Sequence, residues 1–310
     1  MYLKRKAKSN EIKAKFKKNF FGWLLILPSL ALFVFFVWYP ITYNVVLSFF
    51  NNANFENFVW FKNYADVFGE PAFQSALRNT FIYIFWSLII GFLIPLVIGF
   101  LLSEIVHARG VFRVLVYLPC MISGIAVVFL FKSMFGPADY DVINVILIRW
   151  FGMKEGADWL GDPKYVIPVI VVAMTWRGAG GTALIYLSNF QQIDNSIYEA
   201  SRLDGVSPSG RFFKLTIPMM KTTILMLLIL QIISVFQVFY EPMVMTKGGT
   251  NDSISLMLLA YQYAFTKKDA RGVLQIPKSA ATSVILSIII LGITILYFGL
   301  MRFFERREDK

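Results

Sequence analysis

The sequence predicts an all-α, polytopic membrane protein with six transmembrane helices. Hydrophobic residues make up 57% of its 310 residues, whereas roughly 45–50% is usual in soluble globular proteins. The mean hydropathy is +0.62. Six stretches are mainly apolar over about 20 residues, the length that an α-helix needs to cross a bilayer. Backbone polar groups in lipid must be hydrogen-bonded within their own segment, and this requirement favours helices.

The six segments follow one another along the chain at about 20–48, 79–104, 113–131, 166–188, 222–246 and 281–303. The first follows a basic arm, and its apolar run exceeds the roughly 7–15 residues of a signal-peptide core. We therefore expect it to be a membrane span and not a cleaved leader. Prolines in these segments should kink the helices or lie near their ends; they are Pro28, Pro40, Pro95, Pro168 and Pro242.

Lysine and arginine predict the orientation in the cell membrane. Eighteen of them fall on the side that holds both termini, against eleven on the opposite side. The positive-inside rule then places both termini in the cytoplasm. We expect a cytoplasmic arm (1–19) in contact with lipid and not with nucleic acid, a six-helix domain (20–303) with a cytoplasmic loop (191–220), and a cytoplasmic tail (304–310). Aromatic residues near the outer helix ends fit the membrane interface: Trp38, Tyr39, Trp60, Trp150 and Trp159.

The cytoplasmic loop contains an organised polar stretch from Tyr198 to Pro218. Ser196 and Glu199 have the spacing of a capping box, so a short helix is expected to begin at Ser196. Gly205 is the expected end of that helix because glycine readily takes the left-handed conformation. New helix starts are predicted at Ser207–Pro208 and at Thr216–Pro218. A short helix held at the membrane surface would suit a socket on a cytoplasmic partner.

The same stretch resembles the EAA loop of importer-type ABC permeases. Glu199-Ala200-Ser201 is followed after three residues by Gly205, and after nine more by Leu215-Thr216-Ile217-Pro218. WFKNY, PAF and ALRNT within residues 60–80, and FQVFYE and MTKGG within 236–249, are similar to the carbohydrate branch of that family. The departures are small: Ser201 replaces an alanine, Leu and Ile are exchanged near Pro218, and Asp194 replaces a proline and is expected to add a second helix cap.

The resemblance implies a type I ABC importer permease fold and a non-catalytic subunit of a carbohydrate importer. ATP and magnesium would be bound by a partner ATPase dimer, so no cofactor is expected here. Other implied partners are a second homologous permease, an extracytoplasmic sugar-binding protein, received by the outer loops 50–78, 133–165 or 247–280, and the carbohydrate. ATPase coupling is implied for Tyr198, Glu199, Ala200, Ser201, Asp204, Gly205 and Pro218. The alternative for Glu199 is that it only completes the capping box.

Polar residues in the apolar segments predict a substrate path. A charge at the bilayer centre costs at least ~2.5–3.5 kcal/mol, so Arg177 and Glu241 should face a cavity or each other. Offsets of 3, 3 and 4 place four polar residues on one helical stripe, where they offer groups that bond sugar hydroxyls: Gln231, Ser234, Gln237 and Glu241. Trp176 is expected to stack on an apolar sugar face. The alternative is that these residues bond neighbouring helices together.

Other functions find little support. With one cysteine, Cys120, and one histidine, His107, we expect no metal site and no catalytic residues. Gly178, Gly180 and Gly181 lack the strand and the Gly-Lys-Ser/Thr ending of a phosphate loop, and are expected to allow close helix contact or an unwound segment. A secondary carrier or channel remains the alternative, but it should show deep carboxylates or a repeat.

Overall fold

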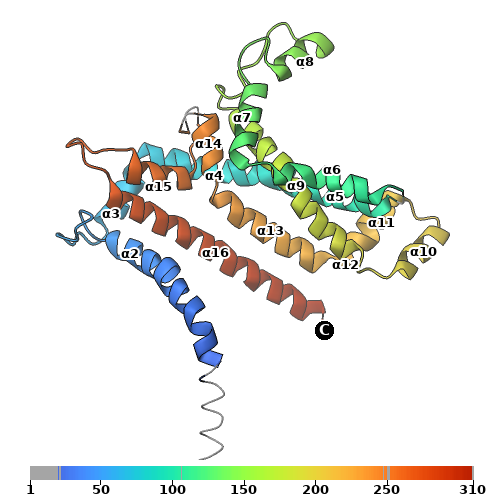
Figure 1. Ribbon diagram of the computed structural model, residues 1–310, viewed down its shortest axis with the longest axis horizontal. Coiled ribbons are helices and arrows are strands. Elements are labelled where there is room, and N and C mark those ends of the chain that lie inside the picture. Colours follow the sequence, from blue (N-terminus) through green and yellow to red (C-terminus); the bar gives the residue numbers. More distant parts are fainter. Residues whose placement is uncertain (1–19, 21, 106, 247, 250–251, 309–310) are drawn as a thin grey trace, which may run out of the picture.

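The structure is a computed structural model of the chain, and it describes residues 20, 22–105, 107–246, 248–249 and 252–308. The basic arm 1–19 lies outside the described residues. The described part is helical, with two isolated antiparallel bridges, Phe50 with Phe58 and Lys268 with Leu274. The all-α prediction is therefore confirmed (Figure 1).

In chain order the helices are α2 (Tyr39–Leu47), α3 (Lys62–Gly69), α4 (Pro71–Trp86), α5 (Leu93–Glu104), α6 (Arg109–Met121), α7 (Gly124–Met134), α8 (Val142–Phe151), α9 (Val166–Phe190), α10 (Asn195–Leu203), α11 (Pro208–Arg211), α12 (Ile217–Met219), α13 (Lys221–Phe236), α14 (Tyr240–Met245), α15 (Leu256–Phe265) and α16 (Ile276–Glu308).

Within the described residues, four continuous helices are long and apolar enough to cross a membrane: Gly22–Leu47, Pro71–Glu104, Val166–Phe190 and Ile276–Arg302. Two further pairs meet the same criteria but are bent, by 91° between α6 and α7 and by 80° between Pro208–Met219 and α13. Six spans result if each bent pair counts as one. Length and hydropathy thus predicted where the spans lie, although not that two of them are broken.

Three predicted boundaries need correction. The second span begins at Pro71 and not near residue 79, because α4 continues outward as a partly polar helix. The third segment is not one helix, since the chain turns between Met121 and Gly124. The fifth does not reach residue 246: α13 ends at Phe236, and Phe239 has φ −139° and ψ −65°, which is far from helical.

The prolines account for local widening of the helices. Proline lacks the N–H that bonds the carbonyl four residues earlier, and its ring crowds that carbonyl. Three π-helical turns accordingly lie just before a proline: Val34–Trp38 before Pro40, Ser87–Phe92 before Pro95, and Phe212–Thr216 before Pro218. Pro168 and Pro242 instead lie in the first turns of α9 and α14, where the missing N–H has no intrahelical partner to lose.

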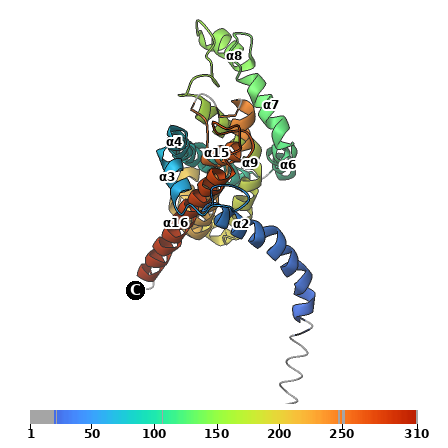
Figure 2. The same cartoon turned by 90° about the vertical axis from the view of Figure 1, so that its left-hand side faces the viewer.

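The long helices form an elongated bundle with different structures at its two ends (Figure 1). The short helices α10, α11 and α12 lie at one end, and α16 runs toward that end. At the other end lie α3 and α15, while α14 stands above α4 and close to α7. The first span, which contains α2, leans away from the bundle, and α7 and α8 project from it in both views (Figures 1 and 2).

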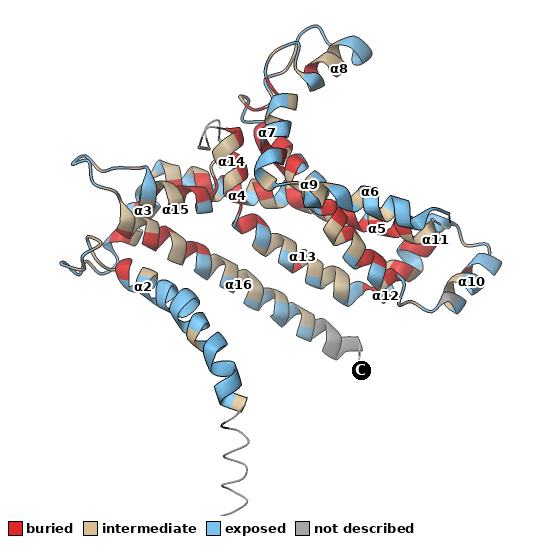
Figure 3. Ribbon diagram, viewed as in Figure 1, coloured by how far each residue is buried: buried red, intermediate tan, exposed pale blue. Residues whose placement is uncertain are grey.

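Burial is concentrated on the inner helices (Figure 3). Of the most apolar window of the α9 span, 56% is buried, against 0% for Gly22–Leu47. Two glycines allow close contacts with α9 or from it: a Cβ on Gly99 of α5 would lie 2.8 Å from Tyr186 Cβ, and one on Gly180 of α9 would lie 2.1 Å from the Val116 carbonyl. Gly180 thus allows close helix contact as predicted, and the unwound alternative is wrong because α9 is continuous.

Candidate functional site

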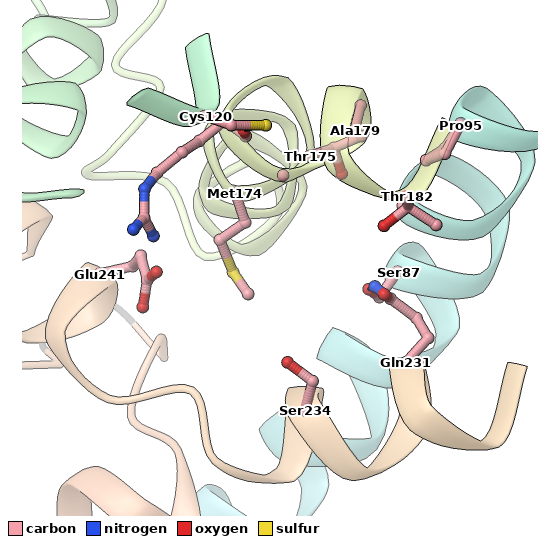
Figure 4. Close-up of a pocket in the computed structure, with 13 residues that line it drawn as sticks. Ser87, Pro95, Cys120, Met174, Thr175, Ala179, Thr182, Gln231, Ser234 and Glu241 are labelled. Carbon is pink, nitrogen blue, oxygen red and sulfur yellow. Dashed lines mark hydrogen bonds between the residues drawn. The ribbon is translucent and has the colours of Figure 1, made fainter. Parts of the chain in front are cut away.

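A cavity of about 380 Å³ lies between the inner helices (Figure 4). The π-helical turn before α5 and α5 itself form one wall, α6 and α9 a second, and α13 and α14 a third. Its lining residues are Ser87, Gly91, Pro95, Cys120, Met174, Thr175, Arg177, Gly178, Ala179, Thr182, Gln231, Ser234 and Glu241. Six helical elements therefore meet around one partly polar space.

One side of the cavity is neutral and hydrogen-bonded. Gln231 Nε2 donates to Ser87 Oγ at 2.7 Å, which joins α13 to the π-helical turn. A Cβ at Gly91 would lie 2.8 Å from Gln231 Nε2 and 2.9 Å from Ser87 Oγ. Glycine at this position therefore leaves room for the amide–hydroxyl pair.

The opposite side of the cavity is charged. Arg177 Nη1 donates to the Tyr240 hydroxyl at 2.7 Å. That hydroxyl also interacts with the Glu241 carboxylate, and Glu241 is buried, with 8% exposed. Arg177 Nε is buried without a hydrogen-bond partner among the described residues. A carboxylate and a guanidinium of opposite charge thus share one wall, and the guanidinium retains hydrogen-bonding capacity.

The predicted helical stripe is wrong. Gln231 and Ser234 lie on α13 and line the cavity, but the helix ends at Phe236, and Glu241 belongs to α14. Gln237 lies at the end of α13, is exposed, and does not contribute to the cavity wall. Glu241 reaches the cavity because the chain turns after α13, and not through helical spacing.

Trp176 also lies away from the cavity. Trp176 is 40% exposed, and its ring centroid lies 5.6 Å from that of Phe131. Its neighbours Thr175 and Arg177 line the cavity, but Trp176 does not. The prediction therefore named four of the residues that line the cavity and two that do not.

Sequence reasoning missed several lining residues. Ser87, Thr175 and Thr182 are polar residues within apolar spans, a signal that could have identified them. Cys120 also lines the cavity; it donates its S–H to the Arg177 carbonyl at 2.9 Å and accepts from Gly181 N at 3.2 Å. Met174, which lines the cavity, and Tyr240, whose hydroxyl accepts from Arg177, carry no such signal in the sequence. Among the described residues, no cluster of His, Cys, Asp and Glu could hold a metal ion.

The loop 191–220 forms the predicted short helix with a different cap. Helix α10 begins at Asn195, and the side chain of Asp194 accepts from the backbone N–H of Ser196 at 2.9 Å. The backbone hydrogen bond from Ser196 holds the pKa of Asp194 below its ordinary value. Ser196 is therefore inside the helix, and the expected capping box with Glu199 is wrong. The aspartate that replaces the usual proline is the cap.

The later turns of the loop follow the prediction in part. Gly205 ends α10 with φ +71°, as expected. Ser207 caps α11 by accepting from Gly210 N at 3.1 Å, and Pro208 follows at the first helical position. Thr216 and Pro218 do not start a new helix: the chain is helical through both, and the break comes at Met220. The second turn therefore lies two residues beyond Pro218.

Side chains of α10 divide into anchoring and exposed groups. The Tyr198 hydroxyl bonds Thr216 Oγ1 at 2.8 Å, and the buried Ser201 donates to the Tyr198 carbonyl at 2.8 Å. Glu199 and Leu203 point into solvent, and Leu203 is 89% exposed. Besides Glu199, four residues of the predicted coupling set are exposed: Ala200, Asp204, Gly205 and Pro218. The loop is thus held from inside while one side of α10 is left uncovered.

Comparisons with known proteins cover nearly the whole chain. The family model for the binding-protein-dependent transport system inner membrane component matches residues 87–310. The lactose transport system permease protein LacF of Rhizobium radiobacter is 33% identical over 294 residues, which are 93% of this chain and 95% of that protein. The arabinooligosaccharides transport system permease protein AraP of Bacillus subtilis is 28% identical over 292 residues, covering 94% and 91%.

The fold also matches a solved structure. A chain from the crystal structure of the bacterial alginate ABC transporter, in complex with an alginate pentasaccharide-bound periplasmic protein, superposes with a TM-score of 0.81. The alignment covers 93% of this chain and 96% of that chain, at 21% sequence identity. At this identity the match concerns the fold alone, and it agrees with the importer permease fold that the sequence predicted.

Proposed function

This chain belongs to the family of binding-protein-dependent transport system inner membrane components, and on that premise we propose how it moves a carbohydrate across the membrane. It is a multi-pass, non-catalytic permease subunit of an ABC importer, and ATP is hydrolysed by a separate subunit.

The substrate class is a carbohydrate. The observation that supports this most strongly is 33% identity to a lactose permease protein over 93% of the chain. A second relative, at 28% identity, is named for arabinooligosaccharides. The assembly would comprise this chain, a second homologous permease, an ATPase dimer and an extracytoplasmic sugar-binding protein.

The cavity of about 380 Å³ is this chain's part of the pathway. Its amide, hydroxyl, carboxylate and guanidinium groups can donate to and accept from sugar hydroxyls. Arg177 and Glu241 on one side, and Gln231 and Ser234 on the other, are the residues that would contact the sugar. The opposite charges of Arg177 and Glu241 suit an uncharged ligand with many hydroxyl groups.

Both termini and α10 face the cytoplasm in this proposal. Eighteen lysine and arginine residues on that side, against eleven on the other, support the orientation. Helix α10 would enter a socket of the ATPase, with Glu199 paired to a basic residue and the exposed Ala200 and Leu203 in apolar contact. The fixed turns on both sides of α10 would keep it rigid enough to transmit force.

Reconstitution into proteoliposomes tests the function. Vesicles containing this chain, the second permease and the ATPase, with ATP enclosed, should accumulate radiolabelled lactose or another sugar from a panel only when the sugar-binding protein is added outside. The matched control encloses ADP. Uptake driven by an ion gradient without ATP would contradict the proposal and favour the secondary-carrier alternative.

A further inference from the structure

The cytoplasmic loop is tied to the last residue of the helix Pro71–Glu104 by a buried ion pair. Arg211 Nη2 lies 2.8 Å from Glu104 Oε2, and the Arg211 side chain is only 8% exposed. Arg211 Nη1 also donates to the Val206 carbonyl at 3.2 Å, one residue after the glycine that ends α10. The guanidinium therefore holds the chain that follows α10 and the end of α5 together.

Apolar contacts support the ion pair from the adjacent turn. Phe212 follows Arg211 and packs on Phe100, with ring centroids 4.6 Å apart. Phe100 lies four residues before Glu104, so both contacts fall on the same face of α5. They belong to a cluster of buried residues that also contains Tyr186 and Met220. The Arg211–Glu104 ion pair and the Phe212–Phe100 contact thus join the loop to α5 through two residues that are adjacent in the sequence.

The helix that ends at Glu104 also forms a wall of the cavity. Pro71–Glu104 is continuous over 34 residues, and Ser87, Gly91 and Pro95 line the cavity. Gly99 presses this helix against α9, since a Cβ there would lie 2.9 Å from the Ala183 carbonyl. This continuous helix would therefore carry a displacement of the α5 end to the cavity. The helix can bend there, at the π-helical turn Ser87–Phe92.

We infer that the Glu104–Arg211 pair is the link that transmits movement of α10 to the cavity wall, and that Glu104 is a positioning residue for transport. The inference rests on the proposed function, because it takes α10 as the part that the ATPase moves. A guanidinium with several fixed donors constrains direction as well as distance. Removing the carboxylate leaves a buried charge unpaired, which loosens the contact far more than loss of an exposed pair.

The test measures coupling separately from assembly. Glu104→Gln should leave the ATPase subunit co-purifying and basal ATP hydrolysis within about twofold of the original complex, while stimulation by the sugar-loaded binding protein and sugar uptake fall at least about fivefold, the lower end of typical coupling between sites. Arg202→Gln is the matched control. Arg202 lies 3.8 Å from the same carboxylate but is 56% exposed, so its loss should change stimulation less than twofold.

A charge reversal adds a rescue. Glu104→Arg combined with Arg211→Glu restores an ion pair at the same place, and it should recover at least half of the stimulation that Glu104→Gln loses. Full stimulation in Glu104→Gln would overturn the inference, as would loss of basal and stimulated hydrolysis in equal proportion, which is the signature of a purely structural role. An original complex that the binding protein does not stimulate would contradict the proposed function itself, and the inference with it.

Discussion

Replacing Gly205 should uncouple ATP hydrolysis from transport through the backbone alone. The glycine has φ +71°, and a Cβ added to it would meet nothing within 4 Å. A side chain therefore has space, and its cost is the left-handed conformation, about 1–2 kcal/mol for an L-residue. A cost of that size lowers the population of the native turn by about 5–30-fold.

Three variants separate this cost from steric effects. Gly205→Asn should stay close to the original protein because asparagine tolerates the left-handed region, Gly205→Ala should be intermediate, and Gly205→Val should lose most transport because β-branched residues are strongly disfavoured there. The assay is binding-protein-stimulated ATP hydrolysis and sugar uptake in proteoliposomes, with co-purified ATPase as the control for assembly. Uptake by Gly205→Val equal to that of the original protein would refute the reasoning, and equal failure of all three variants would show that the conformation is not the cause.

The remaining predictions concern the cavity, the packing and the outer end. Glu241→Ala should lower sugar uptake or change its sugar preference in an assembled complex, whereas Gln237→Ala, which changes an exposed residue outside the cavity, should have little effect on either. Gly180→Val should prevent stable assembly because the valine side chain would collide with the α6 backbone. Gly181→Ala should be tolerated, since its Cβ would lie 3.8 Å from the nearest side-chain atom. The melting temperature of each variant in detergent checks both expectations. Burial raises the pKa of Glu70, but hydrogen bonds from Lys278 and Tyr263 bring this pKa below its ordinary value overall. The stabilising effect of the ionised Glu70 should thus be present above about pH 4.3 and lost as the pH falls through the lowered pKa. Between pH 6 and pH 3, the melting temperature should therefore fall more steeply with pH for the original protein than for Glu70→Gln.

The spans were predictable because the bilayer imposes a length and an apolar composition on every helix. The bends within these spans were harder to predict from the sequence. A proline signals a missing N–H, and three π-helical turns do precede prolines. Whether such a site becomes a wide turn or a break depends on what packs around it. The 91° turn between α6 and α7 comes after Pro119, at Ile122 and Ser123, which leave the helical conformation. Pro95, in contrast, lies in a continuous span.

The candidate site was predictable where the signal was local. Gly205 and the Ser207–Pro208 start follow from residue type alone. The helix cap was misassigned because Asp194 and Ser196 are both good capping residues two positions apart, and only the fold selects between them. The Glu104–Arg211 pair spans 107 residues of sequence, so no pattern within the loop could have indicated it.

Photo-crosslinking from α10 tests the coupling contact most directly. Leu203 is 89% exposed at the end of α10, and Leu203→benzoyl-phenylalanine places a photoreactive group on the side proposed to enter the ATPase. In the assembled complex, irradiation should link this chain to the ATPase subunit, and the yield should change between the ATP-bound and nucleotide-free states. The same group at Trp150, on α8, should give no ATPase adduct. A Leu203 probe that forms adducts only with lipid or with the second permease would contradict the account.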